Sequence, residues 1–432
     1  MQFEVQPTML RASLRPRRDP ARHGDGPLEG RHRVLPAPGP VQPFLSKSET
    51  KMHKFCRKVV YSLVAGALGA GAVAAQAATP ITIGVQAPIT GQYANEGQGI
   101  ADAVKLLVKQ QNAKGGLLGH KLEVKVCDDQ GEAAPAAICA RQLVNDGVLA
   151  VIGSYTSGAA LAAEPIYARA NVIQTSDGTS DELTEHGFKT FFRNAPPNSA
   201  EAVFTAGYFK AMGYKRVAVI TDHSSFATGL ADAVVADAKK DGIDILDKAY
   251  ISAGSQNYTP VLTKLNAMHP QIVYFSGYYT DGGLIKAQMA QLGMKAKFVG
   301  GDANQNVAFA KIAGSAAAGA VIINVPAPQD LPYPEAKEFL SQFQAAYGHQ
   351  PPSIFTLTNA DGLRAVLYTA EKIKSVEAGK LIPALHELHD FKGLTGTFSW
   401  NAVGERTGSP YVAFEITPSG SYKITYPAAA AK

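Results

Sequence analysis

The chain has 432 residues, 46% hydrophobic and 18% charged, which fits a globular protein with two or three cores and excludes an intrinsically disordered chain. Three cysteines are too few for a disulfide scaffold. The net charge of +5 comes from one end, because residues 1–58 hold 12 Lys and Arg against 5 acids and the remainder holds 29 against 31. The body is slightly acidic, so we expect no nucleic-acid partner.

The amino-terminal segment has the pattern of an export signal. Residues 59–75 are uncharged and rich in Val, Leu, Ala and Gly, follow a basic stretch, and lead into an Ala-Gln-Ala cleavage site that ends at Ala77. We therefore expect a signal peptide over residues 52–77; a membrane anchor is the alternative, which the weak hydropathy of the stretch disfavours. Residues 1–51 lack helical or strand periodicity, so we expect translation to start at Met52, with a disordered leader as the alternative.

Cleavage after Ala77 leaves two cysteines, Cys127 and Cys139, in an exported chain. Export to an oxidising compartment favours a disulfide between them. The bridge joins the end of a predicted strand to the next helix and closes a short loop, worth about 3 kcal/mol in the chain-entropy model. Two free buried thiols are the alternative. We expect no metal site, because two cysteines without a nearby histidine cannot form one.

The rest of the chain alternates short β-branched runs with amphipathic stretches. The expected strands are 81–85, 122–126, 149–153, 172–174, 191–193, 216–220, 272–275, 297–299 and 321–323. The expected helices include 99–112, 133–145, one ending near residue 170, 334–347 and 355–372. A possible strand at 397–400 and a hairpin of 411–416 and 422–426 complete the chain. Apolar strands separated by helices predict doubly wound parallel sheets, and a break near 195–198 predicts two lobes.

Small polar residues follow several of these strands, where doubly wound sheets bind ligands. Ser157 and Thr179 could offer hydroxyl and amide donors to a carboxylate at helix starts, although helix capping is the plainer role for Ser157, Thr179 and Ser180. Tyr278 and Asp302 repeat the pattern in the second lobe. Donors in one lobe and an acid in the other fit an α-amino acid zwitterion. Gly97-Gln98-Gly99 is only a weak match to a dinucleotide-binding motif, so we expect no cofactor.

Residues 78–427 resemble the periplasmic leucine/isoleucine/valine-binding protein family, the receptors of branched-chain amino acid ABC transporters. The resemblance lies in the order and spacing of many short motifs, such as Asn-Ala-Lys-Gly-Gly at 112–116, the Asp128-Asp129 pair, Leu-Val-Asn-Asp-Gly at 143–147 and Glu-Leu-Thr at 182–184. It implies a type I periplasmic-binding fold with two lobes joined by three crossovers. The implied lobes are residues 78–197 plus 327–406 and residues 198–326 plus 407–432.

The resemblance also implies a site and partners. Ser157 and the Thr179 backbone would hold a ligand carboxylate, and the Thr179 hydroxyl, the Asp177 carbonyl and the Asp302 carboxylate would hold an ammonium. The implied walls of the side-chain pocket are Tyr155, Phe226, Tyr278 and Phe355, with interlobe core as the alternative role for these aromatics. A monomeric receptor in the periplasm would deliver the ligand to an inner-membrane permease.

Three residues depart from the family pattern. Glu96 stands where relatives often have an aromatic residue, Asp302 is one methylene shorter than the usual glutamate, and Asp177 adds an acid near the ligand amine. Because an unpaired buried charge is costly, we expect a ligand with extra donors or a cation, such as a polar amino acid or an amide, rather than leucine. Alternatively, Glu96 points to solvent at the rim.

Two other functions remain open at this level. A sensor on the same fold would feed a regulator or chemoreceptor. An exported hydrolase would need Asp128, Asp129 or His223 to act in catalysis, although these residues also fit turn and surface positions. The absence of nucleophile motifs in the sequence favours a receptor over an enzyme.

Overall fold

The computed structural model describes residues 79–408 and 410–427. The expected leader, the start at Met52 and the signal peptide over residues 52–77 lie outside these ranges. All described residues belong to one compact unit. Within the described ranges, no helix has the length and hydropathy needed to cross a membrane.

The first sheet has five parallel strands in the order β2-β1-β3-β4-β5. Its strands are β1 (Ile81–Ala87), β2 (Leu122–Asp128), β3 (Ala150–Ile152), β4 (Ile173–Ser176) and β5 (Phe191–Arg193). The short strands β3, β4 and β5 are buried along their whole length. The central strand β3 is apolar throughout, as expected for a parallel sheet covered on both faces, whereas β4 buries Gln174, Thr175 and Ser176 and β5 buries Arg193.

The second sheet has seven strands in the order β15-β14-β10-β9-β8-β6-β7. Five are parallel: β6 (Arg216–Thr221), β7 (Asp244–Tyr250), β8 (Ile272–Ser276), β9 (Lys297–Gly300) and β10 (Val321–Asn324). The hairpin of β14 (Val412–Ile416) and β15 (Tyr422–Tyr426) adds to β10 in antiparallel register. A third, small sheet consists of β11 (Phe391–Gly393), β12 (Gly396–Trp400) and β13 (Arg406–Thr407).

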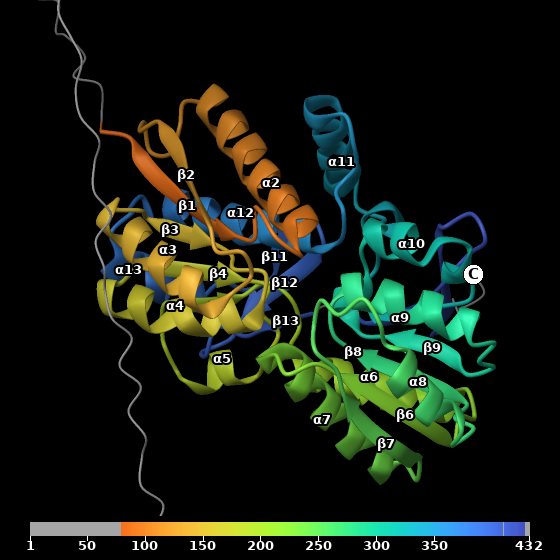
Figure 1. The fold of residues 1–432 in the computed structure, drawn as a ribbon. Coiled ribbons are helices and arrows are strands. Elements are labelled where there is room, and N and C mark those ends of the chain that lie inside the picture. Colours follow the sequence, from red (N-terminus) through yellow and green to blue (C-terminus); the bar gives the residue numbers. More distant parts are fainter. Residues whose placement is uncertain (1–78, 409, 428–432) are drawn as a thin grey trace, which may run out of the picture. The chain divides into compact units, whose positions relative to one another are not determined.

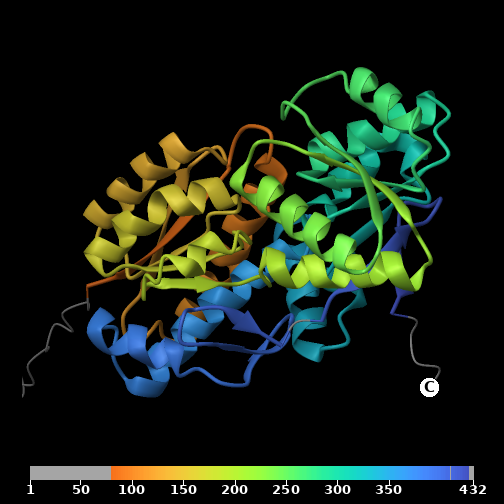
Figure 2. The same cartoon turned by 90° about the horizontal axis from the view of Figure 1, so that it is seen from below.

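Helices cover both sheets (Figure 1). Around the first sheet lie α2 (Ala94–Ala113), α3 (Ala133–Asn145), α4 (Ser157–Ala170), the short α5 (Glu182–Glu185), α12 (Phe355–Ile373) and α13 (Ala378–His386). Figure 2 shows this sheet between α3 and α4 on one side and α12 and α13 on the other. Around the second sheet lie α6 (Asn198–Ala211), α7 (Ser225–Lys240), α8 (Thr259–Asn266), α9 (Tyr279–Gln291) and α10 (Val307–Ala313), and α11 (Pro334–Tyr347) contacts α2.

The chain crosses between the two sheets three times: after β5, after β10 and after β13. The predicted doubly wound α/β class is thus confirmed for both sheets. The exact lobe boundaries stay a prediction; two of them fall between elements of different sheets, and the third, after residue 406, falls inside β13. The crossings bring the carboxyl ends of strands from both sheets to a common region, where the candidate site lies.

Two details differ from the sequence expectation. Helix α2 begins at Ala94 rather than residue 99, and β7, an edge strand with charged residues, was not expected. The glycines of the weak dinucleotide motif allow close packing instead: a Cβ at Gly97 would lie 2.1 Å from the Pro88 oxygen, and one at Gly99 would lie 2.7 Å from Thr356 Oγ1. These contacts fix the first turns of α2 against the β1–α2 loop and against α12.

Candidate functional site

A small cavity lies where strands of both sheets end, and its volume of about 10 Å³ is close to the space of one water molecule. Pockets that hold drug-sized molecules measure roughly 300 Å³ or more, so the side chains around this cavity nearly fill it in the structure. Eight of its lining residues were expected from the sequence and the ninth, Ala303, was not: the lining consists of Tyr155, Ser157, Asp177, Thr179, Phe226, Tyr278, Asp302, Ala303 and Phe355.

The amino terminus of α4 forms one end of the cavity. Thr156, not Ser157, is the N-cap residue of α4, and its side-chain oxygen accepts a hydrogen bond from the Ala159 N–H at 3.4 Å. The Ser157 hydroxyl instead accepts from the Ser180 N–H at 3.1 Å, and the Ser157 N–H donates to the Tyr278 hydroxyl. The expected capping role of Ser157 is therefore wrong. The N–H groups and the helix dipole favour an anionic group at this end of the cavity.

The loop after β4 carries Asp177 and Thr179. The Asp177 carboxylate accepts hydrogen bonds from Thr358 Oγ1 at 2.8 Å and from the Asn359 side-chain amide, both on α12. Burial raises the pKa of Asp177, and the Thr358 hydrogen bond opposes this shift. Neither Thr179 nor Ser180 caps α5, because the residue at the N-cap position is Asp181.

Asp302 forms the acidic end of the cavity, in the 3-10 turn η1 (Asp302–Asn304) after β9. Its Oδ1 accepts from the Ala303 N–H at 2.6 Å, and its own N–H donates to Glu201 Oε1 at 3.1 Å. Only 2% of Asp302 is exposed, and burial raises the pKa of its carboxyl group. The site therefore presents hydrogen-bond donors on the first-sheet side and a carboxyl group on the second-sheet side.

Aromatic side chains from both sheets close the cavity. The ring centroids of Tyr155 and Phe355 lie 5.5 Å apart, those of Tyr155 and Tyr278 5.7 Å apart, and those of Phe226 and Tyr278 5.0 Å apart. Tyr93, which the sequence did not single out, lies 4.4 Å from Tyr278 between centroids. Such rings supply apolar area and a defined shape to a small pocket.

Glu96 does not line the cavity. It is fully buried, and its carboxylate accepts hydrogen bonds from Asn306 Nδ2 at 2.5 Å and Ser353 Oγ at 2.8 Å. The expectation that Glu96 could point to solvent is wrong. Asn306 follows the second sheet, whereas Glu96 and Asn95, which donates to Asn306 Oδ1 at 2.8 Å, belong to α2 beside the first sheet. Glu96 therefore links the two halves of the structure next to the site.

Because the carboxylates of Glu96 and Asp177 both have hydrogen-bond donors, neither is a free charge in an apolar pocket. The sequence-based argument for a ligand with extra donors rested on such unpaired charges, and the observed contacts remove that basis. Of the two acids that line the cavity, Asp177 and Asp302, Asp302 is then the one available to bind a cationic group of a ligand.

The burial of Glu96 predicts a pH-dependent loss of stability. Burial raises its pKa from 4.5 to about 7, and the two hydrogen bonds partly oppose this shift. A carboxyl group whose pKa is higher in the folded than in the unfolded protein adds its full share to the free energy of unfolding at a pH below the unfolded-state pKa. This stabilisation is lost as the pH rises toward the folded-state pKa of about 7. We expect Glu96→Gln to gain about 2 kcal/mol in unfolding free energy relative to wild type between pH 5 and pH 8.

Urea denaturation of both proteins at pH 5 and pH 8 measures this gain. The exposed Glu335→Gln, in α11, is the control and should differ from wild type by the same amount at both pH values. Parallel pH dependence of Glu96→Gln and wild type would contradict the expected titration of Glu96.

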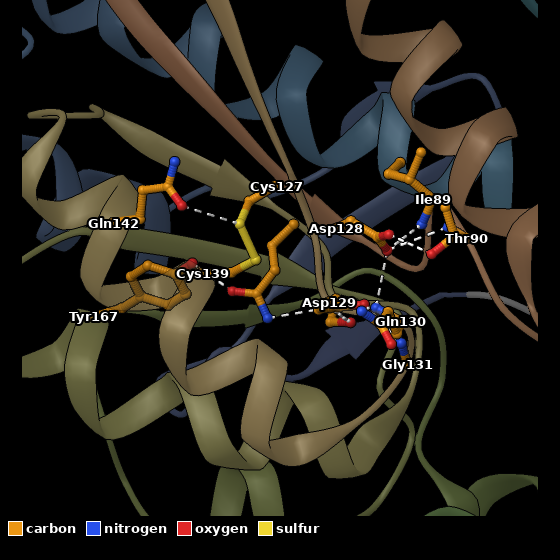
Figure 3. The surroundings of a disulfide bond; sticks show 12 residues. Ile89, Thr90, Cys127, Asp128, Asp129, Gln130, Gly131, Cys139, Gln142 and Tyr167 are labelled. Atoms are coloured by element: carbon orange, nitrogen blue, oxygen red, sulfur yellow. Dashed lines mark hydrogen bonds between the residues drawn. A yellow bond between two sulfur atoms is a disulfide. The ribbon is translucent and has the colours of Figure 1, made fainter. Parts of the chain in front are cut away.

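Cys127 and Cys139 form the expected disulfide between β2 and α3, with 5.6 Å between the two Cα atoms. Figure 3 shows the neighbouring acids Asp128 and Asp129, which bind the adjoining loops. Asp128 accepts from the N–H groups of Ile89, Thr90 and Gln130, and Asp129 accepts from the N–H of Gly131 and the side chains of Gln86 and Ser154. These contacts give both acids a structural role.

The remaining residue considered for catalysis, His223, stacks on Tyr250 at 4.9 Å between ring centroids. Neither residue lines the cavity. Within the described ranges, no group of three or more His, Cys, Asp or Glu side chains could hold a metal ion.

Sequence reasoning missed Glu201, which lies behind Asp302, and the α12 residues that bind Asp177. Glu201 is 101 positions from Asp302, and Asn359 is 182 positions from Asp177. No local motif joins such pairs. The signal in the sequence for Glu201 was an acid between alanines in the first turn of α6, shortly after Pro196 and Pro197 at the first crossing.

This arrangement defines a receptor that encloses a small ligand between two α/β lobes. The family described as periplasmic binding protein matches residues 80–421, and the chain belongs to this family, in its leucine/isoleucine/valine-binding branch. Such proteins are solute-binding receptors of ABC transporters, so the chain is a receptor and not an enzyme.

Two curated relatives illustrate the match. Leu/Ile/Val-binding protein homolog 3 of Brucella melitensis biotype 1 is 30% identical over 345 residues, which cover 79% of this chain and 93% of that protein. Leu/Ile/Val-binding protein BraC3 of Rhizobium johnstonii is 29% identical over 357 residues, which cover 82% of this chain and 96% of that protein.

Solved structures have the same fold. The branched-chain amino acid transporter substrate-binding protein LivJ from Streptococcus pneumoniae, in complex with isoleucine, is similar with a TM-score of 0.74 and 27% identity, over 81% of this chain and 100% of that chain. The leucine-binding protein LivK from Thermotoga maritima has a TM-score of 0.74 over 80% of this chain and 97% of that chain. Because its sequence identity is only 24%, it supports the fold alone. The type I periplasmic-binding fold is thus confirmed.

Proposed function

We propose that this receptor binds a small α-amino acid with an apolar side chain. The observation that supports this most directly is a single cavity with a helix amino terminus at one end, a carboxyl group at the other and aromatic walls between them. A zwitterion matches the two ends, since anions are favoured at helix amino termini and ammonium groups bind carboxylates through charge-assisted hydrogen bonds.

The roles of the individual residues follow from this geometry. Ser157 and the Thr179 backbone hold the ligand carboxylate. The Thr179 hydroxyl, the Asp177 carbonyl and the Asp302 carboxylate hold the ammonium. Tyr155, Phe226, Tyr278 and Phe355 contact the side chain of the ligand. Glu96 supports the closed arrangement from outside the cavity.

The relatives support the ligand class by their names, since they are Leu/Ile/Val-binding proteins, and a structural neighbour holds isoleucine. We further propose that the protein works in the periplasm, as a monomer that delivers the amino acid to an inner-membrane ABC permease. The export pattern at residues 52–77 agrees with this location.

A thermal-shift screen of the protein purified from cells that express the full reading frame tests the proposal. Leucine, isoleucine and valine should raise the melting temperature, because a ligand at 100 times its dissociation constant adds about 2.7 kcal/mol to the stability of the folded form. Aspartate, lysine and benzoate, which lack either the apolar side chain or the amine, should give no shift. A shift with benzoate alone would overturn the amino acid assignment.

A further inference from the structure

A second buried acid stands directly behind Asp302. Glu201, on α6, is fully buried and does not line the cavity. Its Oε1 accepts from the Asp302 N–H at 3.1 Å, and the two carboxyl groups are themselves within hydrogen-bonding reach of each other. Gly301 allows this approach, since a Cβ there would lie 2.8 Å from Glu201 Oε1. Two buried carboxyl groups in contact cannot both be ionised at moderate cost, so they share a proton.

The contacts indicate which group keeps the proton. Asp302 Oδ1 has the Ala303 N–H as a donor, which stabilises the ionised form of Asp302. Glu201 Oε2 accepts no hydrogen bond from the described residues. Burial and the neighbouring Asp302 charge raise the pKa of Glu201. A protonated Glu201 can donate to the Asp302 carboxylate and so satisfy its own second oxygen.

The other titratable groups around the pair agree with this assignment. Tyr274 on β8 and Tyr411 before β14 face the two acids, and burial raises the pKa of both phenols, so they are neutral. Tyr155 and Tyr278, also with raised pKa values, face Asp302 across the cavity. Two charged groups lie nearby. Asp177 interacts with Arg406 and Glu96. Arg193 interacts with Tyr411 and forms an ion pair with Glu405.

We propose that Glu201 is a positioning residue that holds one proton of this carboxyl pair, so that the pair presents a single negative charge to the cavity and selects a ligand with a cationic amine at that end. The proposal rests on the proposed amino acid function and narrows it. A neutral amide or an amine-free carboxylate leaves the buried charge on Asp302 unpaired.

Two substitutions at Glu201 test whether its proton, rather than the volume of its side chain, is what Asp302 needs. In Glu201→Gln the amide can accept from the Asp302 N–H and donate to the Asp302 carboxylate, as the protonated acid does. Glu201→Leu fills a similar volume without a donor. Isothermal titration with leucine at pH 7 should give an affinity within about threefold of wild type for Glu201→Gln and a loss of about 30-fold for Glu201→Leu.

The pH profile is the readout that a structural role would not change. Without its donor, Asp302 should ionise only at higher pH, so the affinity of Glu201→Leu should recover as pH rises from 6 to 9. Wild type and Glu201→Gln should reach full affinity at lower pH. Melting temperatures without ligand show whether each variant is folded.

The outcomes are distinct. If Glu201→Gln loses as much affinity as Glu201→Leu, the pair needs a second charge rather than a proton, and the proposal is wrong. If Glu201→Leu matches wild type in affinity and pH profile, Glu201 does not position Asp302. If wild type binds no amino acid, the proposed function fails separately; the carboxyl ¹³C shifts of the unliganded protein then test the pair, and an ionised Glu201 at pH 7 overturns it.

Discussion

Replacing Asp302 with asparagine should lower the affinity for the amino acid ligand by about 100-fold, or about 3 kcal/mol, the cost of removing one partner of a buried charge pair. Asparagine keeps the volume of the side chain and an oxygen that can accept from the Ala303 N–H. The change therefore removes the charge and little else. Isothermal titration with leucine at pH 7 measures the loss.

The stability of the ligand-free variant should not fall, because Asp302→Asn removes a buried charge that lies beside another carboxyl group, that of Glu201. Glu164→Gln is the matched control: Glu164 is a fully buried acid on α4 that contacts His186 and does not line the cavity. We expect its affinity to stay within about twofold of wild type, the range typical of distant, independent sites. Unchanged affinity in Asp302→Asn would exclude the ammonium role.

Much of the fold could be predicted because the signals are local. The runs at β5, β6 and β8 are short, apolar and rich in β-branched or aromatic residues, and they occur as expected. Strand β7, in contrast, lies at the edge of its sheet, is mostly only half-buried and contains three charged residues, so its sequence does not resemble a buried strand. The first turns of α2 contain Gly97 and polar residues, and tertiary packing holds them in the helix.

The candidate site followed from a topological rule rather than from a motif. Residues after parallel strands meet at one edge of a sheet, which brought Ser157, Asp177, Tyr278 and Asp302 to the same cavity. The rule gives positions but not the direction of each side chain. It could not show that Asp177 is bound by α12, that Glu96 contacts Asn306 instead of the cavity, or that Glu201 lies behind Asp302, since each contact joins elements far apart in the sequence.

Arg193, at the end of β5, is a further residue of this kind. It is fully buried, and its guanidinium donates to Glu405 Oε1 at 2.7 Å, to Thr184 Oγ1 at 3.1 Å and to the Gly178 carbonyl. Gly178 stands between Asp177 and Thr179, so this one side chain joins the loop that lines the cavity to the segment before β13. Removing it should affect both stability and binding.

Arg193→Leu should lower the free energy of unfolding by about 3–5 kcal/mol, since it leaves a mostly buried carboxylate without its partner. The double variant Arg193→Leu/Glu405→Leu should regain at least about 1 kcal/mol, because it also removes that unpaired charge. Urea denaturation of wild type and both variants measures the two changes. Leucine affinity should stay reduced in the double variant, as the Gly178 carbonyl still lacks its donor. If the single variant loses less than about 1 kcal/mol, or the double variant is less stable than the single one, the Arg193–Glu405 pair does not stabilise the loop in this way.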